Sequence, residues 1–213
     1  MALSKVNFNS LNVTPAANKA IKFNSNNNGI ETGDVGGSLV LISTTTASNA
    51  STTSITSGID STYKEYIIKF YDVHPATDSA ILQCNGRDGG SSFDATKTTT
   101  FFYAYHDEGD SDTTLEYNAS YDIAQSTSAF RISNLLGNGN DESYSGTMHL
   151  FDPSNTTFVK HFILRASMYQ SGSYSFDINV AGYFNTTSAI DGLQFSMSSG
   201  AVDSGTIKMY GVS

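Results

Sequence analysis

The segment Ser173–Phe184, SYSFDINVAGYF, constrains the fold more than any other part of the chain. Its apolar side chains hold alternate positions, interrupted only at Gly182: Tyr174, Phe176, Ile178, Val180 and Phe184. Side chains on a strand alternate between two faces, so this segment buries one face and exposes the other to water. Strands of parallel sheets are buried on both faces, whereas a half-buried strand is typical of an antiparallel sheet. The segment therefore predicts an antiparallel sheet with one solvated face.

Ten further segments read as short strands separated by turn-forming sequences rich in Gly, Asn, Asp and Ser. They are residues 38–45, 51–57, 64–72, 80–86, 99–106, 129–136, 144–152, 157–168, 191–198 and 204–212. Nothing helical of any length lies between them, and no repeat of 20–50 residues is visible. The pattern predicts an all-β protein, an antiparallel β-sandwich of jelly-roll-like type that begins at residue 38.

The strand expected at residues 204–212 places Ile207 and Met209 on one face and Lys208 and Tyr210 on the other. This alternation predicts that the strand is paired inside a sheet. Deletion of residues 204–213 is therefore expected to be severe, whereas the fold is expected to tolerate deletion of residues 1–37.

Residues 1–37 differ from the rest because their apolar residues are sparse and irregular, and an Asn/Gly-rich run follows them. Pro15 with AANKA after it predicts at most one helical turn, capped by Thr14. So few apolar side chains do not offset the entropy of ordering such a segment, so we expect an extended arm that orders only against a partner. The residues expected to anchor it are Val6, Phe8, Leu11, Val13, Ile21 and Phe23.

The formal net charge of −9 and the absence of any basic run argue against nucleic acid or an anionic membrane as a partner. The single cysteine, Cys84, excludes an internal disulfide and sits in an apolar strand segment, where a buried thiol is expected. No apolar run has the length of a membrane span, so no membrane insertion is expected.

No residue set in the sequence indicates a reaction, a metal or a cofactor. The histidines, at positions 74, 106, 149 and 161, are far apart and lack the spacing of a zinc site. A Ser-His-Asp triad stays open because its members meet only in space, but no G-x-S-x-G motif marks a nucleophile. The acidic run Asp107–Asp112 is the one place where Ca²⁺ is conceivable, and a solvated hairpin loop explains it as well.

Five tyrosines gather between residues 103 and 144. Aromatic rings of this kind stack on glycans or on protein partners, and ordinary sheet packing accounts for them equally well. The tyrosines considered as ligand contacts are Tyr103, Tyr105, Tyr117, Tyr121 and Tyr144.

From about Gly36 onward the chain resembles a family of structural proteins of tailed bacteriophages, frequent among phages of marine bacteria. The segments that carry this likeness are GGSLVLISTTTAS, ITSGIDSTYKEYIIKFYDVHPATDSAILQ, DGGSSFD and the closing SGTIKMYGV, and the arm segment AANKAIKFNSNNNGIETGD also fits. The resemblance implies a non-enzymatic virion protein, either tail fibre-like or a head decoration, made in the host cytoplasm and assembled with other virion proteins. It also implies a homotrimer and a role in host attachment, with host-surface glycans as possible ligands.

Two alternatives from other classes stay open. The first is a free, carbohydrate-binding, lectin-like module whose loops carry the binding. The second is a depolymerase-type enzyme, which requires an acidic pair or a triad converging in a cleft.

Overall fold

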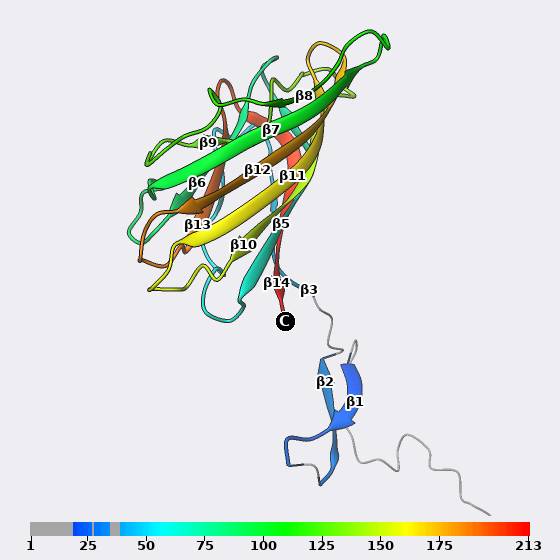
Figure 1. Cartoon of the computed structure of the whole chain (residues 1–213). Helices are drawn as coiled ribbons and strands as arrows, with labels where there is room; N and C mark the ends of the chain where they lie inside the picture. Colours follow the sequence, from blue (N-terminus) through cyan, green and yellow to red (C-terminus); the bar gives the residue numbers. More distant parts are fainter. Residues whose placement is uncertain (1–18, 27, 35–38) are drawn as a thin grey trace, which may run out of the picture. The chain divides into compact units, whose positions relative to one another are not determined.

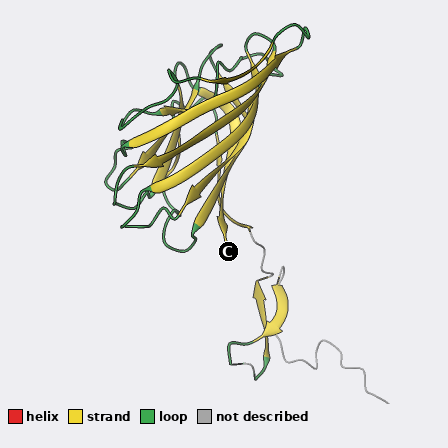
Figure 2. Cartoon of the chain, in the orientation of Figure 1, coloured by secondary structure: helices red, strands yellow, loops and turns green. Residues whose placement is uncertain are grey.

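The computed structural model describes residues 19–26, 28–34 and 39–213, and every element in these ranges is a strand (Figure 2). The chain divides into two compact units, residues 1–38 and residues 39–213. The anchoring candidates Val6, Phe8, Leu11 and Val13, and the start of the expected helical turn at Pro15, lie outside the described residues.

The larger unit contains an eight-stranded antiparallel sheet, whose strands lie side by side in Figure 1. In sheet order they are β3 (Leu39–Thr46), β14 (Val202–Val212), β5 (Glu65–Pro75), β10 (Tyr144–Phe151), β11 (Lys160–Gln170), β12 (Tyr174–Phe184), β7 (Lys97–Asp107) and β8 (Thr113–Tyr117).

A smaller antiparallel sheet covers one face of the large one. Its strands, in order, are β4 (Thr53–Ile55), β13 (Gly192–Met197), β6 (Leu82–Arg87) and β9 (Phe130–Arg131). One hydrophobic cluster contains buried residues of both sheets, such as Phe70 of the large sheet and Phe195 of the small one, whose ring centroids are 5.1 Å apart. The prediction of an antiparallel β-sandwich is confirmed.

The alternation that predicted β12 is confirmed by its burial, because Phe176, Ile178, Val180 and Phe184 are all buried. Gly182 interrupts the series for a steric reason. A Cβ atom at this position would lie 2.6 Å from the ring of Phe162, its partner on β11. The aromatic ring occupies the space that glycine leaves free.

Two elements differ from the sequence prediction. The strand β8 was not expected, because it is an edge strand whose residues are largely exposed and show no burial alternation. The segment 129–136 was expected to be one strand, but only Phe130–Arg131 pairs as a strand and Leu136 forms isolated bridges. Ser133 and Asn134 are buried there, so their polar side chains lie in the core and not on a solvated face.

The smaller unit contains a hairpin of β1 (Lys19–Phe23) and β2 (Ile30–Asp34), which the sequence reading did not predict. Lys19 and Ala20, included in the expected helical turn, are in a strand instead. Ile21, Phe23 and Ile30 are all exposed, and Phe23 lies opposite Ile30. A two-stranded hairpin alone is marginally stable in water, so its exposed apolar side chains still need a partner.

Candidate functional site

The face of the eight-stranded sheet that points away from the core is the largest candidate site, and it is here called the outer face. Directly opposed residues on antiparallel strands share a face, so the pairing register shows which side chains lie together. One row of the outer face crosses the sheet from β3 to β12 as Leu41, Tyr210, Ile67, His149, Ile163 and Ala181. The adjacent row contains Lys208, Lys69, Thr147, Arg165, Asn179, Phe102 and Tyr117.

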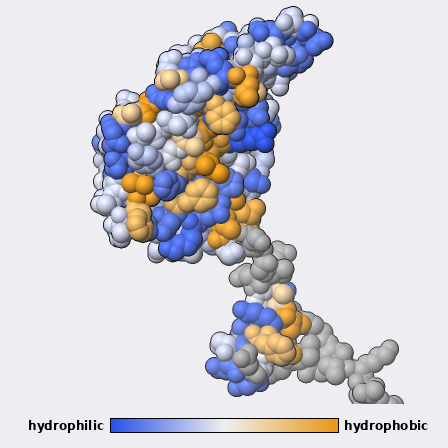
Figure 3. Space-filling view, in the orientation of Figure 1, coloured by the Kyte–Doolittle hydropathy of each residue, from blue (hydrophilic) through white to orange (hydrophobic). Residues whose placement is uncertain are grey.

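Large apolar side chains are exposed along this face, and Figure 3 shows them as orange and tan patches over the strands. Ile163 is 49% exposed and Leu115 is 75% exposed, although both lie on strands with well-paired neighbours. The apolar stripe is here the exposed side chains of Leu41, Ile163, Phe102, Tyr117 and Leu115, together with the partly buried side chains of Ile67 and Tyr210. Several large apolar side chains exposed on one face of a domain mark that face as a candidate binding surface.

Basic side chains flank the apolar stripe on the same face. Lys208, Lys69 and Arg165 lie in one register row, and we call them the basic row. Arg165 donates to Asp177 through Nε and Nη2 at 3.0 and 2.8 Å. This hydrogen-bonded pair raises the pKa of Arg165 and lowers the pKa of Asp177. Asp177 offsets the charge of Arg165, so Lys69 and Lys208, which lie over the rings of Tyr210 and Tyr71, supply the positive charge of this row.

One groove in the outer face is lined by both apolar and polar side chains. Phe102, Ile163 and Ala181 supply its apolar part, and Asn179 and Arg165 supply hydrogen-bonding groups. His149 lines it as well and pairs with Glu65 over 2.5 Å between Nδ1 and Oε1. Apolar surface with a few fixed polar groups is the composition of a site for a protein side chain or a sugar ring.

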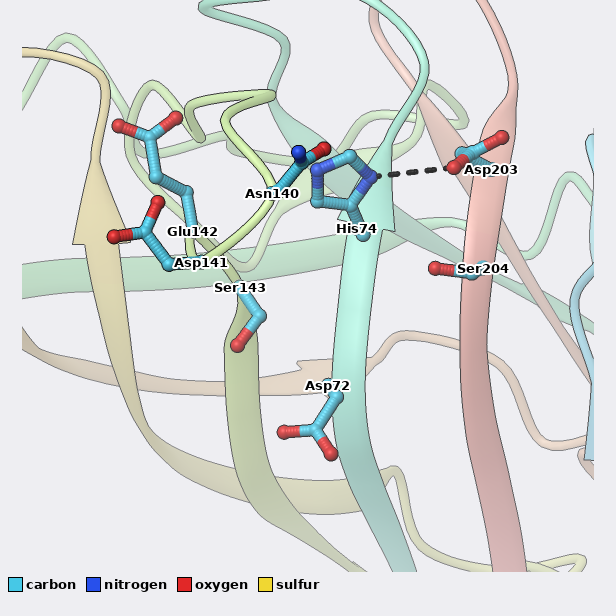
Figure 4. A pocket seen from close by; sticks show the side chains of 8 residues that line it. All are labelled: Asp72, His74, Asn140, Asp141, Glu142, Ser143, Asp203 and Ser204. Carbon is cyan, nitrogen blue, oxygen red and sulfur yellow. Dashed lines mark ion pairs between the residues drawn. The ribbon is translucent and has the colours of Figure 1, made fainter.

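A second concave site, the acidic pocket, lies where β5 and β14 meet the loop before β10 (Figure 4). Its carboxylates are Asp72, Asp141, Glu142 and Asp203. His74 bridges two sides of it, with Nδ1 3.4 Å from Asp203 and Nε2 3.1 Å from the carbonyl oxygen of Gly139.

Three of the four carboxylates of the acidic pocket, those of Asp72, Glu142 and Asp203, have partners within the protein. Glu142 accepts a hydrogen bond from the Gly139 N–H at 2.6 Å, and Asp72 accepts one from the Ser145 hydroxyl at 3.4 Å. Within residues 19–26, 28–34 and 39–213, no group of three or more His, Cys, Asp or Glu side chains has an arrangement that could hold a metal ion.

The histidines show no nucleophile beside them. Throughout the described part of the chain, the hydrogen bonds of histidine rings go to carboxylates or to a backbone carbonyl, as at His74, His106 and His149, and none goes to a serine or threonine hydroxyl. His161 packs edge-on against Tyr183. A histidine that activates a serine must form a hydrogen bond with the serine hydroxyl.

The acidic run Asp107–Asp112 forms the β7–β8 hairpin loop. The carboxylate of Asp107 accepts hydrogen bonds from the backbone N–H groups of Ser111 and Asp112 at 2.8 and 2.7 Å, and from the Ser111 hydroxyl at 2.6 Å. These hydrogen bonds lower the pKa of Asp107 to about 2, and the bond from the Ser111 hydroxyl has the largest effect. Its oxygens serve the turn, which agrees with a solvated hairpin loop.

The structure separates the five tyrosines considered as ligand contacts. Tyr144 is completely buried and Tyr103 nearly so, and therefore neither presents its ring to a ligand at the surface, which corrects that expectation for both. Tyr105 and Tyr121 are partly buried against the core. Tyr117 alone of the five is on the outer face, in the apolar stripe.

The outer face was not predicted, because its apolar side chains are not close together in the chain. The sequence does contain one signal. Ile163 and Phe102 lie two residues from Arg165 and Thr100, so each shares the face of its strand with a polar residue that faces water. These residues come from strands distant in the sequence, and only the register places them together.

No protein-family model, no curated protein and no solved structure matches this chain. The residues that the structure describes include no helix suited to crossing a membrane.

Proposed function

We propose that this protein is a non-enzymatic structural component of a bacteriophage virion, a tail fibre-like or head-decorating appendage that assembles as a homotrimer. The observation that carries the proposal is the exposed apolar stripe on the outer face, where Ile163, Phe102 and Leu115 present large apolar side chains to water. The resemblance to phage structural proteins supplies the setting, and residues 1–37 are its anchor to other virion proteins.

Charge complementarity favours a second copy of this chain as the occupant of the outer face. In this assembly, Lys69 and Lys208 of the basic row on one copy meet the acidic pocket of the next copy, which carries four carboxylates. Complementary charge sets the register of two surfaces, while the apolar stripe supplies the buried area. A contact between different surfaces of neighbouring copies closes into a ring when the rotation permits, as in a trimer.

The experiment is light scattering coupled to size-exclusion chromatography. The wild-type chain is expected to have three times the 22.8 kDa mass of one chain. Ile163→Glu places a carboxylate in the stripe and is expected to give monomers, with unchanged circular dichroism. Ser196→Glu on β13 of the small sheet lies outside the outer face and serves as the matched control.

A wild-type protein that stays monomeric at high concentration contradicts the assembly proposal. Charge reversal tests the proposed electrostatic contact directly. Lys69→Glu with Lys208→Glu is expected to weaken assembly, and reversal of Asp72 and Asp203 to lysine in the same chain is expected to restore it.

A lectin-like function is the second candidate, and the groove in the outer face favours it. Asn179 and Arg165 there lie beside the exposed ring of Phe102, the combination that a sugar ring needs. The test is a glycan array. If the wild-type protein binds a glycan, Phe102→Ala is expected to reduce this binding at least tenfold, and Tyr183→Ala is expected to leave it unchanged. An array without any signal removes this candidate.

A further inference from the structure

Lys97, the first residue of β7, is a completely buried lysine without a carboxylate partner in the described part of the chain. Its Nζ donates to the carbonyl oxygen of Ala95 at 2.8 Å and to Oδ1 of Asn85 at 2.5 Å. A buried ammonium without an anion beside it is unfavourable, so this arrangement requires an explanation.

Backbone hydrogen bonds fix the segments that carry the two side chains. The N–H of Lys97 donates to the Ser126 carbonyl at 2.9 Å, and the N–H of Ser126 donates back to Lys97 at 3.0 Å. The N–H of Ala95 donates to the Gly86 carbonyl at 3.0 Å, which ties the chain before β7 to the residue after Asn85. Lys97 therefore approaches Asn85 from a rigid frame.

The amide of Asn85 is itself held at both ends. Its Nδ2 donates to the carbonyl oxygen of Thr127 at 3.0 Å, and its Oδ1 accepts from the N–H of Gly86 at 3.0 Å. Since a carbonyl bond is about 1.2 Å long, Cγ of Asn85 lies at most about 3.7 Å from Nζ of Lys97. Two groups held this close have a high effective concentration once the amine turns its lone pair toward Cγ.

We propose that Lys97 and Asn85 react after folding to form an intramolecular isopeptide bond. The neutral amine attacks the side-chain carbonyl carbon, and a bond forms between Nζ and Cγ. The negative charge that develops on Oδ1 is stabilised by the N–H of Gly86. A proton moves from Nζ to Nδ2, the bond between Cγ and Nδ2 breaks, and ammonia leaves. The step changes no oxidation state and needs no further reactant.

The Lys97 ammonium must first lose a proton to solvent water or hydroxide, and its surroundings favour this. Burial lowers the pKa of the Lys97 ammonium to about 8, against the opposing influence of Cys84, Asp94 and Asp88. An amine with this pKa is neutral in a far larger fraction of molecules at neutral pH than an exposed lysine is. The bond is therefore expected to form faster as the pH rises through this range.

The experiment is mass spectrometry of the purified full-length chain, before and after incubation in alkaline buffer. We expect a mass lower than that of the sequence by one ammonia. Trypsin cannot cut after an acylated lysine, so digestion is expected to give a branched peptide in which residues 70–87 are joined to residues 88–131.

Two variants separate this reaction from alternatives. Lys97→Arg keeps the positive charge without a lysine amine and is expected to retain the full mass. Lys160→Met removes a second lysine that is buried in the described part of the chain. Its Nζ donates to the Thr186 carbonyl and not to a side-chain amide, so this variant is expected to keep the bond.

Asn85 precedes Gly86, and cyclisation of an Asn-Gly pair also releases ammonia. In that case the mass loss resides in residues 70–87 alone, and cleavage after Lys97 continues. That outcome, or the full sequence mass after prolonged incubation, overturns the proposal.

Discussion

Replacing Phe162 with alanine is expected to lower the free energy of unfolding by about 3–5 kcal/mol, the range for losing a buried aromatic side chain. Phe162 is buried at the centre of the sandwich, with ring centroids 4.8 Å from Phe130 and 5.2 Å from Phe184. Its ring also covers Gly182 on the adjacent strand. The variant therefore leaves a cavity bordered by both sheets, and glycine offers no side chain to fill it.

Urea denaturation followed by circular dichroism measures this effect. The midpoint is expected to fall while the dependence of the free energy on urea stays the same. Phe158→Ala is the matched control, because it removes the same side chain from a position that is 69% exposed, and a change within about 0.5 kcal/mol is expected. Equal effects of the two variants contradict the burial of Phe162.

The half-buried strands were predictable because their signal is local. In β12, alternation along a single strand defines the buried face, and no knowledge of the partner strand is needed. The reason for Gly182 was not predictable, since it depends on Phe162, which lies 20 residues earlier and faces it only through the register. Local periodicity therefore predicts the burial of a strand but not what packs against it.

The same limit applies to the sites. In TTTFFYAYH, alternation puts Phe101, Tyr103 and Tyr105 on one face and Phe102 on the other, but sequence alone does not say which face meets the core. The structure places Phe101 and Tyr103 inside and Phe102 on the outer face. For the same reason the tyrosines considered as ligand contacts are mostly core residues.

The neighbours of Lys97 depend on tertiary structure even more strongly. Lys97 and Asn85 belong to different sheets, and Ser126 and Thr127 come from a third segment. A lysine at the start of a strand predicts a solvated charge, because lysine is rarely buried. Lys97 is excluded from water only because three segments, those that contain Lys97, Asn85 and Ser126, pack together.

Deletion of residues 204–213 is expected to abolish folding. These residues form most of β14, which pairs with β5 on one side and β3 on the other, so the deletion breaks two ladders in the interior of the eight-stranded sheet. It also removes the buried side chains of Ile207 and Met209. The remaining chain would expose the edge of β5, a long strand prone to pairing with other molecules.

The expected result is an insoluble product, or a soluble one that lacks the β signal in circular dichroism and is digested rapidly by protease. Met209→Ala gives a graded version of the same test and is expected to cost about 2–5 kcal/mol. Deletion of residues 1–38 is the control, because the unit of residues 39–213 contains the whole hydrophobic cluster of buried residues. That shortened chain is expected to keep its unfolding midpoint, and a folded, protease-resistant chain of residues 1–203 would show that β14 is dispensable to the sandwich.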